Sequence, residues 1–245
     1  MINNLPIITI DGLSGSGKST ISLLLAKKLK WNLLDSGILY RAVGYILNNQ
    51  SIHIDSKDTV LEIIANIQLV SSQSFKYKVH FNKEDISDYL INEEIGIEAS
   101  RVSKYGYIRE ALLPIQHSCV MSPGLIANGR DMGTKVFPDA DLKLFFIADL
   151  SVRAQRRHQQ LSDLGQTIDV KDINKSLIER DERDLTRNIS PLKAANDAIV
   201  LDSTELNIES VLDKILELYK ISVVRHKWGN IINGNTNRIW NPIPR

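Results

Sequence analysis

Eight residues near the N-terminus constrain the fold of this chain more than any other feature. Residues Gly12–Ser19 read GLSGSGKS and match the pattern G-x-x-x-x-G-K-[ST] in full. The β-branched run Pro6–Asp11 before them predicts a buried strand, and the leucine spacing in Lys18–Lys30 predicts a helix after them. In that context the glycines let backbone N–H groups and the helix N-terminus face phosphate oxygens. The motif therefore predicts binding of a nucleoside triphosphate; a glycine-rich turn that fits by chance is the alternative.

The motif also assigns roles to single residues. Lys18 is expected to bridge the β- and γ-phosphates of ATP, and the Ser19 hydroxyl is expected to bind Mg²⁺. The other loop residues expected to line the ATP phosphates are Gly12, Ser14, Gly15, Ser16, Gly17 and Thr20. What is done with the triphosphate does not follow from the motif, because the same loop serves many activities.

Strand-like and helix-like segments alternate along most of the chain. Short apolar runs that predict further buried strands occur at residues 31–34, 125–127, 142–148 and 198–201. Helical patterns occur at residues 37–49, 151–164, 170–187 and 208–219. This order predicts an α/β fold, a P-loop parallel sheet flanked by helices, with ligands bound beyond the carboxyl ends of the strands.

Two regions depart from this alternation. Within residues 63–97, Gln68–Val70 and Phe75–Phe81 alternate between apolar and polar residues and are separated by polar turns. That pattern is typical of antiparallel strands, so an inserted subdomain with a small antiparallel sheet is expected. The tail at residues 225–245 is rich in Asn, Gly and Pro and is expected to be irregular.

Composition narrows the classes of partner. The formal net charge is +1, so no overall field favours a nucleic-acid polymer or an anionic membrane. No apolar run reaches the roughly 18 residues of a membrane span, and the N-terminus lacks a basic signal region, so a cytoplasmic protein is expected. The single cysteine, Cys119, excludes an intramolecular disulfide and is expected to be a buried small residue. The five histidines show no metal-ligand spacing.

Arginines concentrate in the second half of the chain. Seven of the thirteen lie between residues 130 and 187, and on a helix Arg180, Asp184 and Arg187 share one face. One interpretation is a solvated face with ion pairs worth about 0.2–0.5 kcal/mol each. The other is phosphoryl transfer between two phosphates, in which arginine forks neutralise the oxygens and a mobile lid excludes water.

Five motifs, in order and spacing, resemble those of the bacterial cytidylate kinases over about residues 6–220. They are Ile8–Gly12 leading into the P-loop, Leu34–Gly37 with Tyr40-Arg41, Gly129–Thr134 with Val136–Pro138, Glu179–Arg187, and Leu201–Thr204. The insert at residues 63–97 also resembles the extra piece of the bacterial family's nucleoside-monophosphate-binding (NMP-binding) domain.

The resemblance implies roles for matching positions. Arg41, Arg130 and Arg187 would hold the phosphate of CMP, and Ser36, Arg180 and Asp184 would lie around its sugar and phosphate. Ser100, Arg109 and Asp131 would recognise cytosine, since a carboxylate accepts from the exocyclic amino group and an arginine donates to ring acceptors. Arg153 and Arg157 would face ATP. The residues expected to act in catalysis are Lys18, Arg130, Arg157 and Arg187.

The same resemblance divides the chain. The core P-loop domain would comprise residues 1–36, 98–150 and 188–224, and the NMP-binding subdomain residues 37–97. A helical lid would span residues 151–187. The expected substrates are CMP or dCMP and ATP with Mg²⁺, and the expected oligomeric state is a monomer.

Departures and alternatives accompany the resemblance. Asn128 stands where the family usually carries an acidic residue, and Tyr105-Gly106-Tyr107 replaces a more usual proline-arginine stretch. Two other function classes stay open at this point. One is another small-molecule P-loop kinase, for which Asp35 is the candidate base toward a hydroxyl acceptor. The other is a nucleotide-binding module without catalysis.

Overall fold

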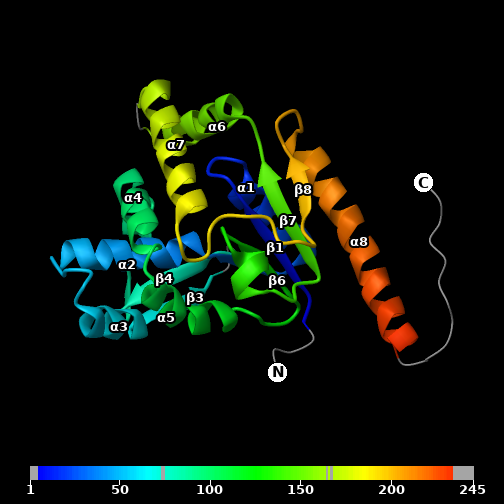
Figure 1. Ribbon diagram of the computed structural model, residues 1–245, viewed down its shortest axis with the longest axis horizontal. Coiled ribbons are helices and arrows are strands. Elements are labelled where there is room, and N and C mark those ends of the chain that lie inside the picture. Colours follow the sequence, from blue (N-terminus) through cyan, green and yellow to red (C-terminus); the bar gives the residue numbers. More distant parts are fainter. Residues whose placement is uncertain (1–4, 73–74, 164, 166–167, 234–245) are drawn as a thin grey trace.

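A five-stranded parallel sheet forms the centre of the computed structural model, which describes residues 5–72, 75–163, 165 and 168–233 (Figure 1). The strand order is β2 (Asn32–Asp35), β6 (Leu125–Asn128), β1 (Ile7–Gly12), β7 (Leu142–Ile147) and β8 (Ile199–Asp202), and every neighbouring pair is parallel. All residues of β1 and β6 are buried, as expected of central strands covered on both faces. The predicted fold class is confirmed.

The two faces of the sheet are covered differently. Helices α1 (Lys18–Leu29) and α8 (Ile208–Asn233) cover one face, where Leu25, Phe146 and Ile215 belong to one buried cluster. On the other face, the short π-helical segment η2 (Met132–Val136) packs against β1 and β6. Cys119 is buried in that second cluster, as the sequence predicts.

Beside the sheet lies a mostly helical region with its own core (Figure 1). It contains α2 (Gly37–Asn49), α3 (Lys57–Ala65), α4 (Glu93–Val102), α5 (Gly106–His117) and the turn η1 (Ser87–Leu90). The predicted small antiparallel sheet is present as β3 (Ile67–Ser71), β4 (Tyr77–Phe81) and β5 (Glu84–Asp85). Because Ile108 and Leu112 of α5 share a buried cluster with α2 and α3, the packing favours a subdomain that ends near residue 117 rather than 97.

Two helices lie over the carboxyl ends of the strands (Figure 1). They are α6 (Leu150–Asp163) and α7 (Val170–Thr186), and they pack through Ala154, Leu161, Ile173 and Leu177. This small cluster is separate from the sheet core. The movement expected of a lid at residues 151–187 stays a prediction.

The expectation of an irregular tail from residue 225 is wrong as far as residue 233. Helix α8 continues to Asn233 instead of ending near Tyr219. Residues 225–233 contain no proline and a single glycine, Gly229, and one glycine within a helix costs about 1 kcal/mol. That cost is too small to end a long helix. Residues 234–245 lie outside the described part of the chain.

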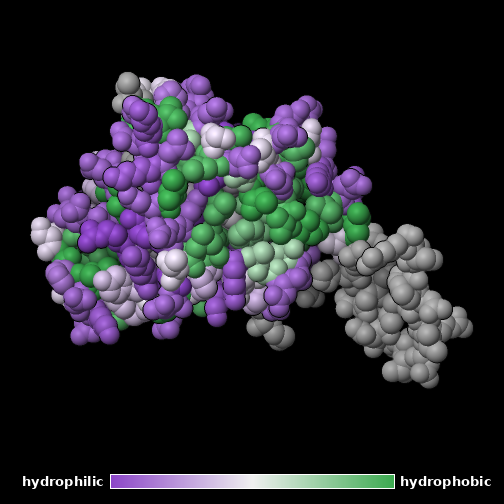
Figure 2. Space-filling view, turned by 45° about the horizontal axis from the view of Figure 1, so that its top comes forward, coloured by the Kyte–Doolittle hydropathy of each residue, from purple (hydrophilic) through white to green (hydrophobic). Residues whose placement is uncertain are grey.

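The surface of one face shows hydrophobic residues gathered near its middle, with hydrophilic residues over the helical region around α2 and over α6 and α7 (Figure 2). Exposed apolar residues include Ile199 and Val200 on the edge strand β8. Among the described helices, none has the length and apolar character that a membrane span requires.

Candidate functional site

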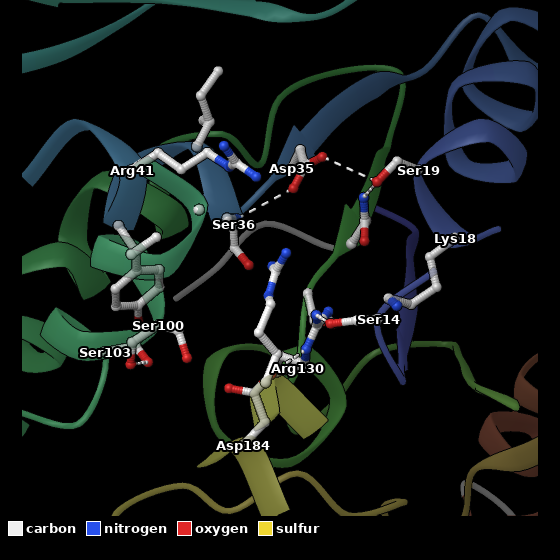
Figure 3. Close-up of a pocket in the computed structure, with 18 of the residues that line it drawn as sticks. Ser14, Lys18, Ser19, Asp35, Ser36, Arg41, Ser100, Ser103, Arg130 and Asp184 are labelled. Carbon is white, nitrogen blue, oxygen red and sulfur yellow. Dashed lines mark hydrogen bonds and ion pairs between the residues drawn. The ribbon is translucent and has the colours of Figure 1, made fainter. Parts of the chain in front are cut away.

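A single cleft of about 460 Å³ joins the P-loop to the helical region. The P-loop, the start of α2, the loop after β6 and the C-terminal half of α7 all contribute to its walls. In the close-up, Ser14, Lys18 and Ser19 lie on one side and Arg41, Ser100 and Ser103 on the other, with Arg130 between them (Figure 3). The cleft opens at the carboxyl ends of the strands, where ligands of open α/β sheets bind.

Close approach of the backbone explains the glycine at the end of β1. Gly12 has a φ of 141°, and a Cβ atom there would lie 2.1 Å from the carbonyl oxygen of Phe146. Gly15 has a φ of 74°, and a Cβ atom there would meet the backbone of Arg153 at 3.0 Å. The loop therefore follows a path between β7 and α6 that residues with side chains would obstruct.

Lys18 turns toward its own loop in this structure. Its Nζ donates to the carbonyl oxygen of Leu13 at 2.5 Å and to Ser16 Oγ at 3.3 Å. Burial lowers the pKa of Lys18 well below its usual range, and the nearby Arg130 lowers it further. A phosphate oxygen would supply the negative charge that this buried ammonium otherwise receives only from more distant carboxylates.

Helix α7 supports the P-loop through a carboxylate that the sequence analysis missed. Asp181 Oδ1 accepts a hydrogen bond from the backbone N–H of Ser14 at 3.0 Å, and Asp181 Oδ2 accepts one from Arg153 at 2.5 Å. Arg153 also donates to the carbonyl oxygens of Ser14 and Ala148, and its side chain is buried. Arg153 is not among the residues that line the cleft, and its donors hold the backbone of the loop, while the contact with ATP that was expected of it stays a prediction.

A second buried support lies under the other side of the loop. Ser203 Oγ donates to the carbonyl oxygen of Ser16 at 3.2 Å and accepts from Arg156 at 3.1 Å. Arg156 also donates to the Ser203 carbonyl oxygen at 2.6 Å. Ser203 belongs to a motif that the resemblance noted, but no role was assigned to either residue. Arg157, by contrast, lines the cleft, and its Nη1 donates to Gln160 Oε1 at 3.4 Å.

Arg130 stands where the two sides of the cleft meet. Its Nε donates to Asp184 Oδ2 at 2.7 Å, and its Nη2 donates to Ser14 Oγ of the P-loop at 2.8 Å. Burial lowers the pKa of Arg130, but the carboxylates of Asp184 and Asp181 outweigh burial and raise it. This arginine therefore stays charged and contacts the donor and acceptor sides together.

Arg187, at the end of α7, is buried beside the same carboxylate. Its Nε donates to the Ser190 carbonyl oxygen at 2.6 Å, and its Nη1 donates to Ser103 Oγ at 3.3 Å and lies 3.7 Å from Asp184 Oδ1. Burial lowers the pKa of Arg187, and the charge of Arg109 lowers it further. An incoming phosphate would relieve this crowding of positive charge.

The three residues expected to recognise a base come together at the inner wall. Arg109 Nη2 donates to Asp131 Oδ2, and Arg109 Nη1 donates to the Ser103 carbonyl oxygen at 3.1 Å. The ring of Tyr40 lies 5.2 Å from the Arg109 guanidinium. Ser100 Oγ is buried and has no hydrogen-bond partner among the described residues. That hydroxyl, aimed into the cleft, is suited to a ligand atom.

The remaining predicted residues also border the cleft. Ser36, Arg41 and Arg180 line it, and Arg41 donates to the carbonyl oxygens of Leu90 and Asn92 at 2.9 and 2.8 Å. Both carbonyl groups are backbone partners, and they hold the Arg41 guanidinium at the wall of the cleft.

Asp11 connects the P-loop strand to the loop that carries Arg130 and Asp131, and the sequence analysis assigned it no role. Its two carboxylate oxygens accept from the backbone N–H groups of Met132 and Gly133 at 2.9 and 2.8 Å. Burial raises the pKa of Asp11 to about 6, against the opposing effect of those two N–H donors. The Asp11 carboxylate therefore holds the backbone directly after Asp131, and with it the position of Asp131.

Ser19, the first residue after the P-loop lysine, lies between a carboxylate and a side-chain amide. Ser19 Oγ lies 3.3 Å from Asp35 Oδ2 and accepts a hydrogen bond from Asn128 Nδ2 at 3.1 Å (Figure 3). Among the described residues there is no cluster of three His, Cys, Asp or Glu side chains. The protein therefore offers few ligands of its own at this point.

Comparison with known proteins agrees with this arrangement. The family model described as cytidylate kinase matches residues 8–221. The chain belongs to the cytidylate kinase family. Its relatives include the cytidylate kinases of Azotobacter vinelandii (46% identical over 213 residues, 86% of this chain and 93% of that protein) and Aeromonas salmonicida (44% over 212 residues, 86% and 92%). The resemblance seen in the sequence motifs is thereby confirmed.

Solved structures show weaker likeness. A gluconokinase from Sinorhizobium meliloti covers 91% of this chain and 97% of its own, at 12% identity and a TM-score of 0.47. A TM-score this low supports no conclusion about activity. Within the cytidylate kinase family, the last residues of this chain, 222–245, lie beyond the matched region, so the C-terminal end of α8 also extends past it.

Proposed function

We propose that this protein transfers the γ-phosphoryl group of ATP to CMP or dCMP, giving ADP and CDP or dCDP. The observation that carries the proposal is Arg130, which donates both to Ser14 of the P-loop and to Asp184 in the acceptor half of the cleft. A phosphate on either side of this guanidinium can replace one of those partners. The relatives named cytidylate kinase identify the acceptor class.

Charge neutralisation and positioning account for the chemistry. A nucleotide phosphate is already an anionic nucleophile at neutral pH, so no general base is required. Two polyanions repel one another, and Arg41, Arg130 and Arg187 line the space in which they must meet. Arginine forks at such a centre stabilise charge that spreads over the transferred group. We infer the same role for Arg157 on the ATP side, together with Lys18.

Recognition of cytosine is assigned to the buried wall. The Asp131 carboxylate suits the exocyclic amino group, and the Arg109 guanidinium suits the ring acceptors. The ion pair between them fixes both groups before a base arrives. Uracil, which presents a carbonyl in place of the amino group, would leave the carboxylate facing another acceptor, and this penalises UMP. Ser100 supplies a further hydroxyl with no other partner among the described residues.

Mg²⁺ is assigned to Ser19. The donor set fits a hard cation, because the Ser19 hydroxyl and the Asp35 carboxylate are oxygen donors that lie 3.3 Å apart. Ser19 and Asp35 would hold the ion, and the chemistry that it would supply is neutralisation of charge on the ATP phosphates. Asn128 contributes an N–H donor to Ser19 in place of a second carboxylate, so most ligands must come from the nucleotide and water.

An acceptor panel tests the proposal. ADP release is measured in a coupled assay with CMP, dCMP, UMP, AMP and shikimate as acceptors. We expect turnover with CMP or dCMP and much lower kcat/KM with UMP and AMP. Turnover with shikimate alone would show a hydroxyl kinase, and ATP binding without any turnover would show a non-catalytic module. Equal rates with UMP would contradict the role given to Asp131.

A further inference from the structure

Lys76, directly before strand β4 of the inserted antiparallel sheet, is held against the edge of the central sheet. Its backbone forms an isolated parallel bridge with Leu33 of β2. Its carbonyl oxygen accepts a hydrogen bond from Ser72 Oγ at 2.5 Å. These two contacts hold the Lys76 backbone in place. Its bridge partner Leu33 lies two residues before Asp35, which lines the cleft.

The side chain of Lys76 borders the transfer centre. It lines the main cleft, and it also lines a smaller cavity of about 150 Å³ next to it. Ser19, Asp35 and Asn128 line both spaces as well. Lys76 is thus the cation that the inserted subdomain presents to the residues around the proposed Mg²⁺ position.

The charges around Lys76 leave it available to an anion. Some lysines of the fold are paired, such as Lys78 with Asp85 and Lys143 with Asp197, both at 2.7 Å. Lys76 Nζ forms no hydrogen bond or ion pair with any residue in the described ranges. Asn128 carries no charge, so Asp35 is the one carboxylate among the described residues that line the smaller cavity.

We propose that Lys76 is a substrate-binding residue whose ammonium contacts the phosphate of the acceptor nucleotide, on the side where that phosphate faces Ser19 and the ATP γ-phosphoryl group. The inference rests on the proposed function for the identity of the acceptor. A flexible lysine is a point charge that adapts to a phosphate oxygen, whereas the arginines opposite bind in fixed forks. Because the inserted segment 63–97 contains no arginine, Lys76 would be its contribution to reducing the repulsion between the two phosphates.

Replacement by glutamine tests the charge while keeping most of the side chain. Lys76→Gln should raise the Kd for CMP and lower kcat/KM for CMP by about tenfold, because one contact to a charged oxygen is lost. The Kd for ATP and the Kd for cytidine, which has no phosphate, should not change. Lys76→Arg should restore most of the activity. The difference between Lys76→Gln and the unaltered protein should narrow in about 0.5 M KCl, because salt screens an exposed charge.

Lys83→Gln is the matched control, since it removes an exposed lysine from the same inserted sheet without touching the cleft. It should leave every constant unchanged. Values for Lys76→Gln within twofold of the unaltered protein would overturn the proposal, as would equal weakening of CMP and cytidine or a loss confined to ATP. Turnover of CMP by the unaltered protein tests the proposed function, while the binding titrations test Lys76 separately.

Discussion

The donor and acceptor halves of the cleft are built in opposite ways. The donor half is a continuous run of backbone at residues 12–20, and buried side chains hold that backbone from behind, among them Asp181, Arg153 and Ser203. The acceptor half consists of side chains that come from α2, α4, α5, the loop after β6 and α7. Its arginines are already engaged, Arg109 with Asp131 and Arg130 with Asp184.

Because of this difference, we expect the two halves of the cleft to bind their nucleotides in different ways. In the donor half, buried side chains set the path of the loop backbone before ATP arrives, so we expect little rearrangement of that backbone. In the acceptor half, a phosphate must compete with carboxylates that already hold the cations, so part of the binding energy is used to exchange partners. Affinity for the acceptor should therefore depend on single ion pairs, whereas affinity for ATP should depend on the loop as a whole.

The largest expected effect belongs to the donor half. Lys18→Met removes the buried ammonium while keeping most of the length of the side chain, and kcat/KM should fall about 10³-fold for every acceptor. The affinity for CMP in the absence of ATP should remain, because no acceptor contact changes. Isothermal titration with CMP and steady-state assays measure both. Parallel losses of CMP and ATP affinity would show that the two halves are not separable in this way.

Asp11 belongs to both halves, since it lies near the end of β1, beside the P-loop, and its carboxylate holds the loop that carries Asp131. Its pKa of about 6 lies above the ordinary value of 3.8, so its contribution to the free energy of unfolding is present below pH 3.8 and is lost as the pH rises through 6. That loss is at most about 3 kcal/mol for a shift of this size. Asp11→Asn abolishes the titration, so the free energy of unfolding of the variant relative to the unaltered protein should rise between pH 4 and pH 6.5. Urea unfolding across that range gives the difference, and a pH-independent difference would place the titration elsewhere.

Arg187→Ala tests the acceptor half by removing one of its phosphate-binding forks. We expect kcat/KM for CMP to fall about 10²-fold. The melting temperature should also fall by a few degrees, because the buried guanidinium donates to Ser190 and Ser103. Arg183→Ala on the same helix is the control, since Arg183 does not line the cleft. Equal losses in the two variants would mean that α7 needs its arginines for stability rather than for phosphate binding.

The smallest change should come from Asp131→Asn. The asparagine oxygen still accepts from Arg109, while the side-chain amide can now donate to the uracil carbonyl. The ratio of kcat/KM for CMP to that for UMP should fall by about tenfold, with ATP affinity unchanged. Steady-state assays with both acceptors measure the ratio. A proportional loss for CMP and UMP would assign Asp131 to the support of Arg109 alone.

The two halves also differ in how far the sequence predicts them. The P-loop residues are contiguous, so the motif gave their roles directly, and the parallel sheet followed from the alternation of apolar runs. The acceptor residues lie up to 151 positions apart, from Ser36 to Arg187, and only the family resemblance connected them. Asp181, Ser203 and Asp11 escaped prediction because each meets its partner only after distant elements pack.

Local signals explain the missed and misjudged elements. Helix α5 contains Pro114, and α4 contains Gly96, so neither segment carries a clean helical pattern. Both helices form because Ile108, Leu112 and Val102 reach the core around α2. The family resemblance implied that Arg153 faces ATP. In the structure Arg153 is buried in an ion pair with Asp181, and no pattern in the sequence marks that pairing.

Helix α7 carries its two key carboxylates less than one turn apart. Asp181 binds the P-loop amide of Ser14, and Asp184 binds Arg130. Both belong to one rigid element, so a small rotation of α7 that freed Asp184 from Arg130 would also displace Asp181 from the P-loop. Helix α7 therefore connects the two halves of the cleft. A nucleotide that displaces one of these carboxylates should also disturb the contact that the other carboxylate makes.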